Sequence, residues 1–119
     1  MFINCTNHNS KNWSKEQYEA ASLFGEVVDY PFPNVLPNED EKDIDLFAEN
    51  VVDDILRMQP KVVMCQGEFN LTYSIVSKLK LRGIRVVAAC SDRITEEERM
   101  PDGSTRKIAN FRFVKFREY

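Results

Sequence analysis

Three polar segments contain the side chains best suited to bind or transform a small ligand. They span residues 6–12, 66–72 and 91–93. An amide side chain donates and accepts hydrogen bonds at once, which suits the edge of a nucleobase. The candidate ligand-binding residues in these segments are Thr6, Asn7, Ser10, Lys11, Gln66, Gly67, Thr72, Ser91 and Arg93.

His8 and Glu68 are the candidates for proton transfer. An unperturbed imidazole titrates near neutrality, so His8 can act as a general acid or base, or it can be a loop residue that hydrogen-bonds the backbone. Glu68 precedes a predicted helix, where the helix dipole favours a carboxylate even without a ligand. For each residue both the catalytic and the purely structural interpretation stay open.

Other residues of these segments suit phosphate binding, again with structural alternatives. Arg93 can clamp a phosphate or pair with the acids at 96–98, and Lys11 can contact ligand or solvent. Gly67 would let the backbone approach a ligand, next to free N–H groups at a helix start. Thr72 is equally suited to be a helix-start hydroxyl. The sequence has no glycine-rich phosphate fingerprint, hydrolase triad signature or metal motif, so we expect neither a metal nor a cofactor.

The elements that must position these segments alternate between strand and helix. Apolar runs predict strands over residues 1–5, 25–32, 61–65 and 85–90. Capping signals and apolar periodicity predict helices that begin near residues 15, 41 and 69 and end near residues 24, 58 and 81. A turn at Asp102-Gly103 predicts a C-terminal hairpin of two antiparallel strands.

This order of elements predicts an α/β fold. We expect a small Rossmann-like three-layer sandwich whose sheet is mainly parallel, with a C-terminal β-hairpin. One domain should cover residues 1–119, with a β/α core over 1–91 and a hairpin extension over 92–119. With the strand order 2-1-3-4, the three polar segments meet at the carboxyl ends of the strands, where such sheets bind ligands.

Composition and charge restrict the partners of the protein. A net charge of −3 argues against a general affinity for long nucleic acids. No stretch is long and apolar enough to span a membrane, and no signal peptide is evident. The three cysteines are too far apart in sequence for a metal knuckle, and their apolar surroundings predict buried thiols. We therefore expect a cytoplasmic protein that contacts no membrane.

Five stretches together resemble a known family: FINCTNH with NWS, then PFPNV, then CQGEFNLTYSIVSKLK and GIRVVAACSDR. Over residues 1–93 the chain looks like the small CRISPR-associated Rossmann-fold (CARF-like) proteins of type III systems. The resemblance implies a homodimer that binds a cyclic oligoadenylate second messenger through strand-end loops. Some such proteins only sequester the ring, whereas ring nucleases cleave it without metal and leave a 2′,3′-cyclic phosphate.

The resemblance and the residues together predict a cytoplasmic homodimer that binds cyclic tetra-adenylate in antiviral signalling and cleaves it. His8 and Glu68 would transfer protons or position a hydroxyl, Lys11 and Arg93 would hold phosphates, and amides would contact adenine or ribose. Two alternatives stay open. One is a nucleoside or nucleotide N-glycosidase with Glu68 as nucleophile or base, and the other is a non-catalytic ligand sponge or regulatory module.

Overall fold

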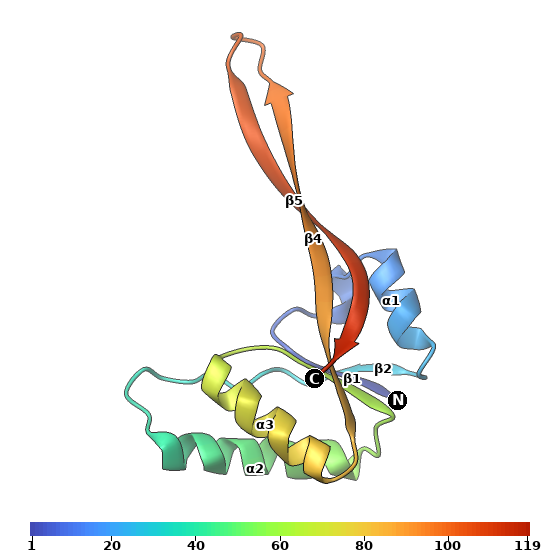
Figure 1. Ribbon diagram of the computed structural model, residues 1–119, viewed down its shortest axis with the longest axis vertical. Helices are drawn as coiled ribbons and strands as arrows, with labels where there is room; N and C mark the ends of the chain where they lie inside the picture. The colour runs from blue at the N-terminus through green and yellow to red at the C-terminus, as the bar shows by residue number, and fades with distance from the viewer.

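The computed structural model describes residues 1–119 as one mixed five-stranded sheet with three α-helices (Figure 1). The strands are β1 (Phe2–Cys5), β2 (Val27–Asp29), β3 (Val62–Cys65), β4 (Arg85–Arg99) and β5 (Thr105–Glu118). The helices are α1 (Lys15–Ser22), α2 (Glu41–Arg57) and α3 (Phe69–Leu81), and a short 3-10 turn, η1, covers Ser10–Asn12. The strand order is β2-β1-β3-β4-β5, with the first four strands parallel and β5 antiparallel. The predicted α/β fold and the order 2-1-3-4 are confirmed.

The longest helix, α2, forms where the sequence predicts it because its start and its apolar face are both well specified. The Asp40 carboxylate caps the helix by accepting from the N–H groups of Lys42 and Asp43, both at 3.1 Å. Val51 and Ile55 are buried on one face, and acidic residues occupy the exposed face. None of the helices, α2 included, has an apolar stretch that could cross a membrane.

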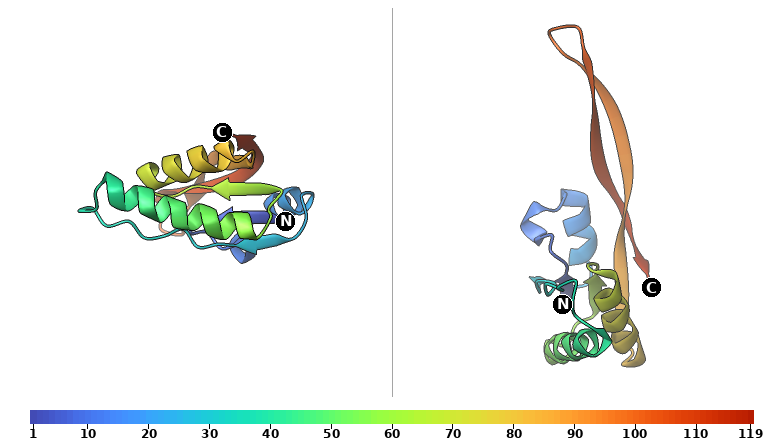
Figure 2. Two further views of the ribbon diagram at one scale, coloured as in Figure 1. Left: turned by 90° about the horizontal axis from the view of Figure 1, so that it is seen from below. Right: turned by 90° about the vertical axis from the view of Figure 1, so that its left-hand side faces the viewer.

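Helices cover both faces of the sheet, which makes the three layers that the sequence predicts. Successive residues of a strand point to opposite faces. Ile3 and Val63 therefore pack against α2 and α3, which lie side by side in Figure 1. Phe2 and Val62 pack on the other side with Ala21 of α1. Figure 2 shows the helices from two further directions.

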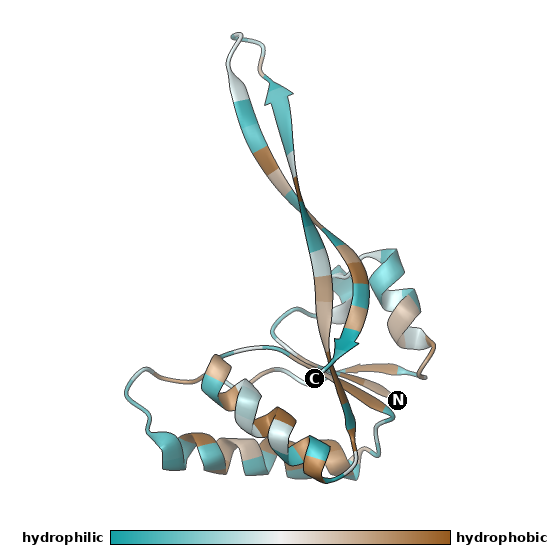
Figure 3. Ribbon diagram, in the orientation of Figure 1, coloured by the Kyte–Doolittle hydropathy of each residue, from teal (hydrophilic) through white to brown (hydrophobic).

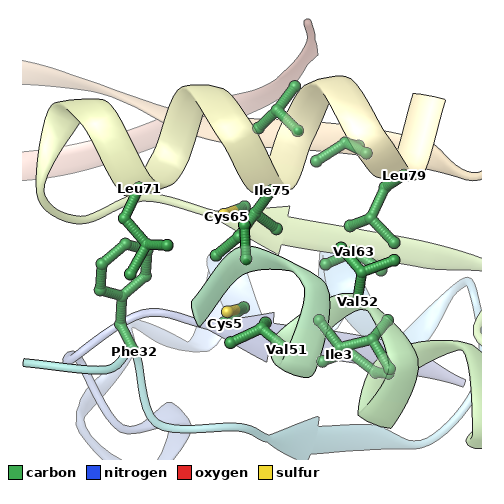
Figure 4. Packing of buried hydrophobic residues seen from close by; sticks show 14 residues of the cluster. Ile3, Cys5, Phe32, Val51, Val52, Val63, Cys65, Leu71, Ile75 and Leu79 are labelled. Atoms are coloured by element: carbon green, nitrogen blue, oxygen red, sulfur yellow. The ribbon is translucent and has the colours of Figure 1, made fainter. Parts of the chain in front are cut away.

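Two cysteines belong to the core on the α2–α3 side (Figure 4). Cys5 and Cys65 are register partners on β1 and β3, and neither side chain is accessible to solvent. A hydrogen bond with Cys5 that favours the neutral thiol, together with burial, raises the pKa of Cys65. The thiolate is the reactive form of cysteine, so a raised pKa makes the Cys65 thiol unreactive. Both cysteines pack in the core as small apolar side chains.

The fourth strand is longer than predicted and does not end at Cys90. It continues to Arg99, so residues 91–93 are strand and not the loop that we expected. Beyond the end of β3, only β5 pairs with this part of β4. The register shifts between Cys90 and Ser91, whose partners are Lys115 and Phe113, so Val114 is the extra residue of a β-bulge. Antiparallel pairing with β5 keeps the chain extended where an isolated β/α unit would turn.

We call residues 91–118 the arm. The arm projects from the core and gives the molecule an extent of 56 Å along its longest axis (Figures 1 and 2). Acids on β4 pair with bases on β5, as Glu98 does with Arg106 at 2.8 Å. The outer part of β4 is almost entirely polar, whereas β5 carries apolar residues among its polar ones (Figure 3). On one face the half-buried Ile94 and Ile108 are diagonal neighbours across the two strands.

Candidate functional site

A groove of about 870 Å³ lies at the carboxyl ends of the parallel strands, where the sequence predicts a ligand site. We call it the strand-end groove. Its lining comes from the loop after β1, the start of α1, the end of β3 and one face of the arm. The lining residues are Thr6, Asn7, His8, Asn9, Asn12, Trp13, Ser14, Gln17, Met64, Gln66, Gly67, Ala89, Ser91, Phe111 and Phe113. Its volume lies within the range of about 300–1,000 Å³ that is usual for ligand pockets.

A hydrogen-bond network beneath the groove holds the loop that follows β1. The side chain of Asn4 is fully buried, and its Nδ2 donates to Asp29 Oδ1 and to the carbonyl of His8, both at 2.8 Å. The Thr6 hydroxyl donates to Asn4 Oδ1 at 2.7 Å. Ser10 donates to both carboxylate oxygens of Asp29, from its N–H and its hydroxyl. Thr6 and Ser10 are predicted ligand contacts, but their hydroxyl groups donate hydrogen bonds within the protein.

Asp29 is the ionised member of this network. Its partial burial alone would raise the pKa of the carboxyl group, but hydrogen bonds from Asn4 and Ser10 outweigh burial and hold the pKa below the ordinary value of 3.8. A carboxyl whose pKa falls on folding stabilises the fold above its unfolded pKa. That contribution is lost as the pH falls through the folded pKa, so the loop is held firmly at neutral pH.

The network leaves the side chains at the tip of the same loop free to face the groove. The carbonyl of His8 accepts from Trp13 Nε1 at 3.2 Å as well as from Asn4, whereas its imidazole makes no hydrogen bond. Asn7 is exposed and makes no side-chain hydrogen bond. The backbone of the loop is thus fixed while an imidazole and amides remain available to a ligand.

Gln66 and Gly67 line the groove, and each also has a structural role. Gln66 Oε1 accepts from the N–H of Ala89 at 2.9 Å, which ties the end of β3 to β4 and leaves its amide nitrogen for a ligand. A Cβ atom at Gly67 would lie 2.5 Å from the ring of Phe32, which is buried in the core. Close packing against Phe32 therefore explains the glycine, whereas the sequence suggested an approach to ligand.

Replacing Gly67 with Ala is expected to destabilise the protein by about 1–3 kcal/mol, because the buried Phe32 ring has little room to move. Urea unfolding would measure the change. If Gly67→Ala combined with Phe32→Leu regains no stability over Gly67→Ala alone, the clash is not the cause.

Glu68 lies beside the groove but does not line it. Its carboxylate caps α3 by accepting from the N–H groups of Asn70 at 3.0 Å and Leu71 at 2.8 Å. The cap agrees with the structural interpretation that the sequence left open. The two hydrogen bonds engage both carboxylate oxygens. Thr72 lies one turn further along α3, outside the groove, with its hydroxyl oxygen buried and without a partner.

Of the remaining predicted residues, Ser91 lines the groove, whereas Arg93 and Lys11 do not. Ser91 lines the groove from β4, next to Phe113 on β5. Arg93 is the next residue outward on the same face of the arm, beyond the lining, and makes no ion pair with the acids at 96–98. Lys11 also lies outside the lining and is exposed. The segments near positions 8, 66 and 91 thus meet at one groove, with Glu68 and Arg93 at its margin.

Sequence reasoning missed the aromatic residues that the arm brings to the groove. Phe111 and Phe113 line it although they follow residue 66 by more than forty positions. Trp13 lines it from the other side and packs edge-on against Phe2 at 6.2 Å between ring centroids. Asn9, Asn12 and Gln17 add further amides. Only the alternation of β5 hinted that Phe111 and Phe113 share a face.

The groove is polar but nearly uncharged. Its lining contains no Lys, Arg, Asp or Glu, and His8 is its one readily titratable side chain. No group of three or more His, Cys, Asp and Glu side chains is placed to hold a metal ion. Amides, hydroxyls and aromatic rings suit the flat, hydrogen-bonding parts of a ligand, so charged parts would lie toward the margin, near Lys11 and Arg93.

Fold and groove together define an α/β protein with a polar groove at the carboxyl edge of a mainly parallel sheet. The model of the uncharacterized protein MJ1673 family matches residues 1–117, and the chain belongs to this family. No curated protein and no solved structure matches the chain.

Proposed function

We propose that the strand-end groove binds a cyclic oligoadenylate, cyclic tetra-adenylate first among the candidates. The observation that carries the proposal is the lining itself, which combines free amides with aromatic rings and lacks charge. Asparagine and glutamine can pair with the hydrogen-bonding edge of adenine, and aromatic rings can stack on its face. The sequence resemblance to CARF-like proteins of type III CRISPR systems supports the same ligand class.

The proposal includes cleavage of the ring, with His8 as the general base. The imidazole would take the proton of a ribose 2′-hydroxyl, whose oxygen then attacks the adjacent phosphorus. A bond forms between the 2′-oxygen and phosphorus, and the bond from phosphorus to the 5′-oxygen breaks. The departing 5′-oxygen takes a proton from the imidazolium, which leaves a linear product with a 2′,3′-cyclic phosphate.

Sequestration without cleavage is the second candidate, and one observation favours it. With the Glu68 carboxylate engaged as a helix cap, His8 is the single proton-transfer group in the groove. The same engagement of Glu68 weighs against the N-glycosidase alternative, which needs this carboxylate free to attack or to activate water.

The proposal also includes a homodimer in the cytoplasm. A cyclic tetranucleotide has two-fold rotational symmetry. A two-fold dimer matches it by presenting two copies of the strand-end groove, one from each subunit. Large apolar side chains on α3 are free for a subunit contact, since Tyr73 is 78% exposed and Leu81 is 86% exposed. Three free cysteines suit a reducing compartment.

Incubation of the purified protein with radiolabelled cyclic tetra-adenylate and a chelator tests the proposal. We expect retention of the ring with one ring per two chains, followed by release of a linear product with a 2′,3′-cyclic phosphate. Asn7→Ala should weaken binding by about 5- to 100-fold, the worth of one amide–adenine pair. Asn50→Ala is the matched control, because Asn50 is exposed on α2 away from the groove.

Each other outcome has a defined meaning. Tight retention without product after long incubation would establish sequestration. Release of free adenine from a mononucleotide would support the glycosidase instead. If the ring is neither retained nor cleaved, the proposed function is wrong.

A further inference from the structure

Phe111 is exposed to an extent that the fold itself does not explain. Its side chain is 73% exposed although it lies on the arm face that lines the strand-end groove. Neither another aromatic ring nor a cation lies over its ring. A single exposed Phe is common on protein surfaces, so exposure alone indicates nothing. What distinguishes Phe111 is its position in the wall of a groove and the residue beside it.

That neighbouring residue is Arg93. Arg93 and Phe111 are register partners on β4 and β5, so their side chains emerge on the same face of the arm. Two other bases of the arm are paired, Arg106 with Glu98 and Arg112 with Asp92. Arg93 has no ion-pair partner, and it is the base that lies beside Phe111 on the groove face. The arm therefore presents an uncovered ring and an uncommitted guanidinium side by side, at the outer end of an otherwise neutral groove.

The position of this pair relative to the groove is set by a series of packed rings. Phe2 in the core contacts Phe116 at 5.0 Å between centroids, and Phe116 contacts Phe113 at 4.9 Å. Phe111 is the next residue outward on the same face. The extra residue at the bulge, Val114, lies between Phe113 and Lys115 and keeps Phe113 and Phe116 on one side. The inner part of the arm is thus anchored to the core, which holds Phe111 over the groove.

We propose that Phe111 and Arg93 form a nucleotide-unit subsite on the arm, in which a purine base stacks on the ring and its phosphate contacts the guanidinium. The inference rests on the proposed function, since it concerns one nucleotide of the same ligand. An aromatic face accepts any base, and a guanidinium binds phosphate oxygens in a fork. The neutral groove would hold a neighbouring nucleotide by its edges, and the subsite supplies the cation that the groove lacks.

Filter binding of radiolabelled cyclic tetra-adenylate to matched variants tests the subsite. We expect Phe111→Ala to weaken binding by about 5- to 100-fold, the worth of one base stack, and Phe111→Trp to retain it. Leu23→Ala is the control, because Leu23 is 84% exposed just after α1 and outside the groove. Arg93→Ala should reduce the slope of log affinity against log salt by about 0.7, whereas Arg112→Ala, on the opposite face, should leave the slope unchanged.

Fluorescence of Phe111→Trp gives a second readout that does not depend on tight binding of the ring. Titration with the cyclic ring or with linear tetra-adenylate should quench the emission of the added indole. The wild type, whose one indole is Trp13, gives the change in emission to subtract. If the ring binds wild type and Phe111→Ala equally, the subsite is wrong while the proposed function stands. If neither the ring nor the linear oligonucleotide changes the emission, the subsite is also wrong. Failure of the ring to bind wild type, together with quenching by linear tetra-adenylate, would overturn the proposed function alone.

Discussion

Asn4→Asp is expected to destabilise the protein by about 3–5 kcal/mol at neutral pH, the cost of a buried charge without a partner. Asn4 is fully buried, and its amide donates to the Asp29 carboxylate and to the His8 carbonyl. A second carboxylate in this position replaces both donors with an acceptor and faces Asp29 at hydrogen-bond distance. Urea unfolding at several pH values would measure the loss.

The pH dependence of this variant should run opposite to that of the wild type. The wild type loses the contribution of Asp29 only as the pH falls below the ordinary carboxyl pKa of 3.8, because folding lowers the Asp29 pKa. Burial next to Asp29 raises the pKa of the new carboxyl instead, so Asn4→Asp should gain stability relative to wild type as acid protonates it. The double variant Asn4→Asp with Asp29→Asn restores one amide–carboxylate pair and should recover part of the loss. Equal stability of the single and double variants would mean that the two side chains do not interact.

His8→Ala should slow cleavage of cyclic tetra-adenylate by about 10²- to 10⁴-fold, the usual contribution of a general base. Binding of the ring should change much less, because the backbone of His8, and not its imidazole, holds the loop. Single-turnover rates with enzyme in excess would separate the chemical step from binding. The residual rate of His8→Ala should depend on pH differently from the wild-type rate, because the variant lacks the general base.

Glu68→Gln is the companion variant for this experiment. A glutamine can still accept one of the two hydrogen bonds at the start of α3, so we expect at most a modest loss of stability, about 0.5–1 kcal/mol. Cleavage should persist, since the Glu68 carboxylate is engaged with the helix. Loss of cleavage in Glu68→Gln with folding intact would show that the cap opens during the reaction and that Glu68 acts on the ligand.

The elements of the β/α core were predictable because their signals are local. The bounds predicted for α3, residues 69–81, are those observed, since Glu68 supplies a cap and Gly83 a left-handed residue after the last turn. β3 was predictable as a buried parallel strand from its continuous apolar run. The second strand is shorter than predicted, Val27–Asp29 within the expected 25–32, because only those residues pair with β1.

The length of β4 and the composition of the groove depended on contacts between distant residues. Nothing near Cys90 signals that the strand continues, since its partner over 91–99 is β5, which follows it in sequence. The same pairing carries Phe111 to the groove. The role of Gly67 likewise depends on Phe32, which precedes it by thirty-five residues. Pattern reasoning over short windows does not detect such pairs.

By itself the sequence determined that strand-end loops rich in amides and hydroxyls would meet at one edge of a parallel sheet, because alternation of strand and helix leaves few topologies. Only the tertiary structure decided which of those polar groups are free. Asn4, Thr6 and Ser10 hydrogen-bond within a network around Asp29, while Asn7 and the imidazole of His8 face the groove. The reason is physical: a buried polar group must find a partner, and the partner here comes from β2, far away in sequence but adjacent in the sheet.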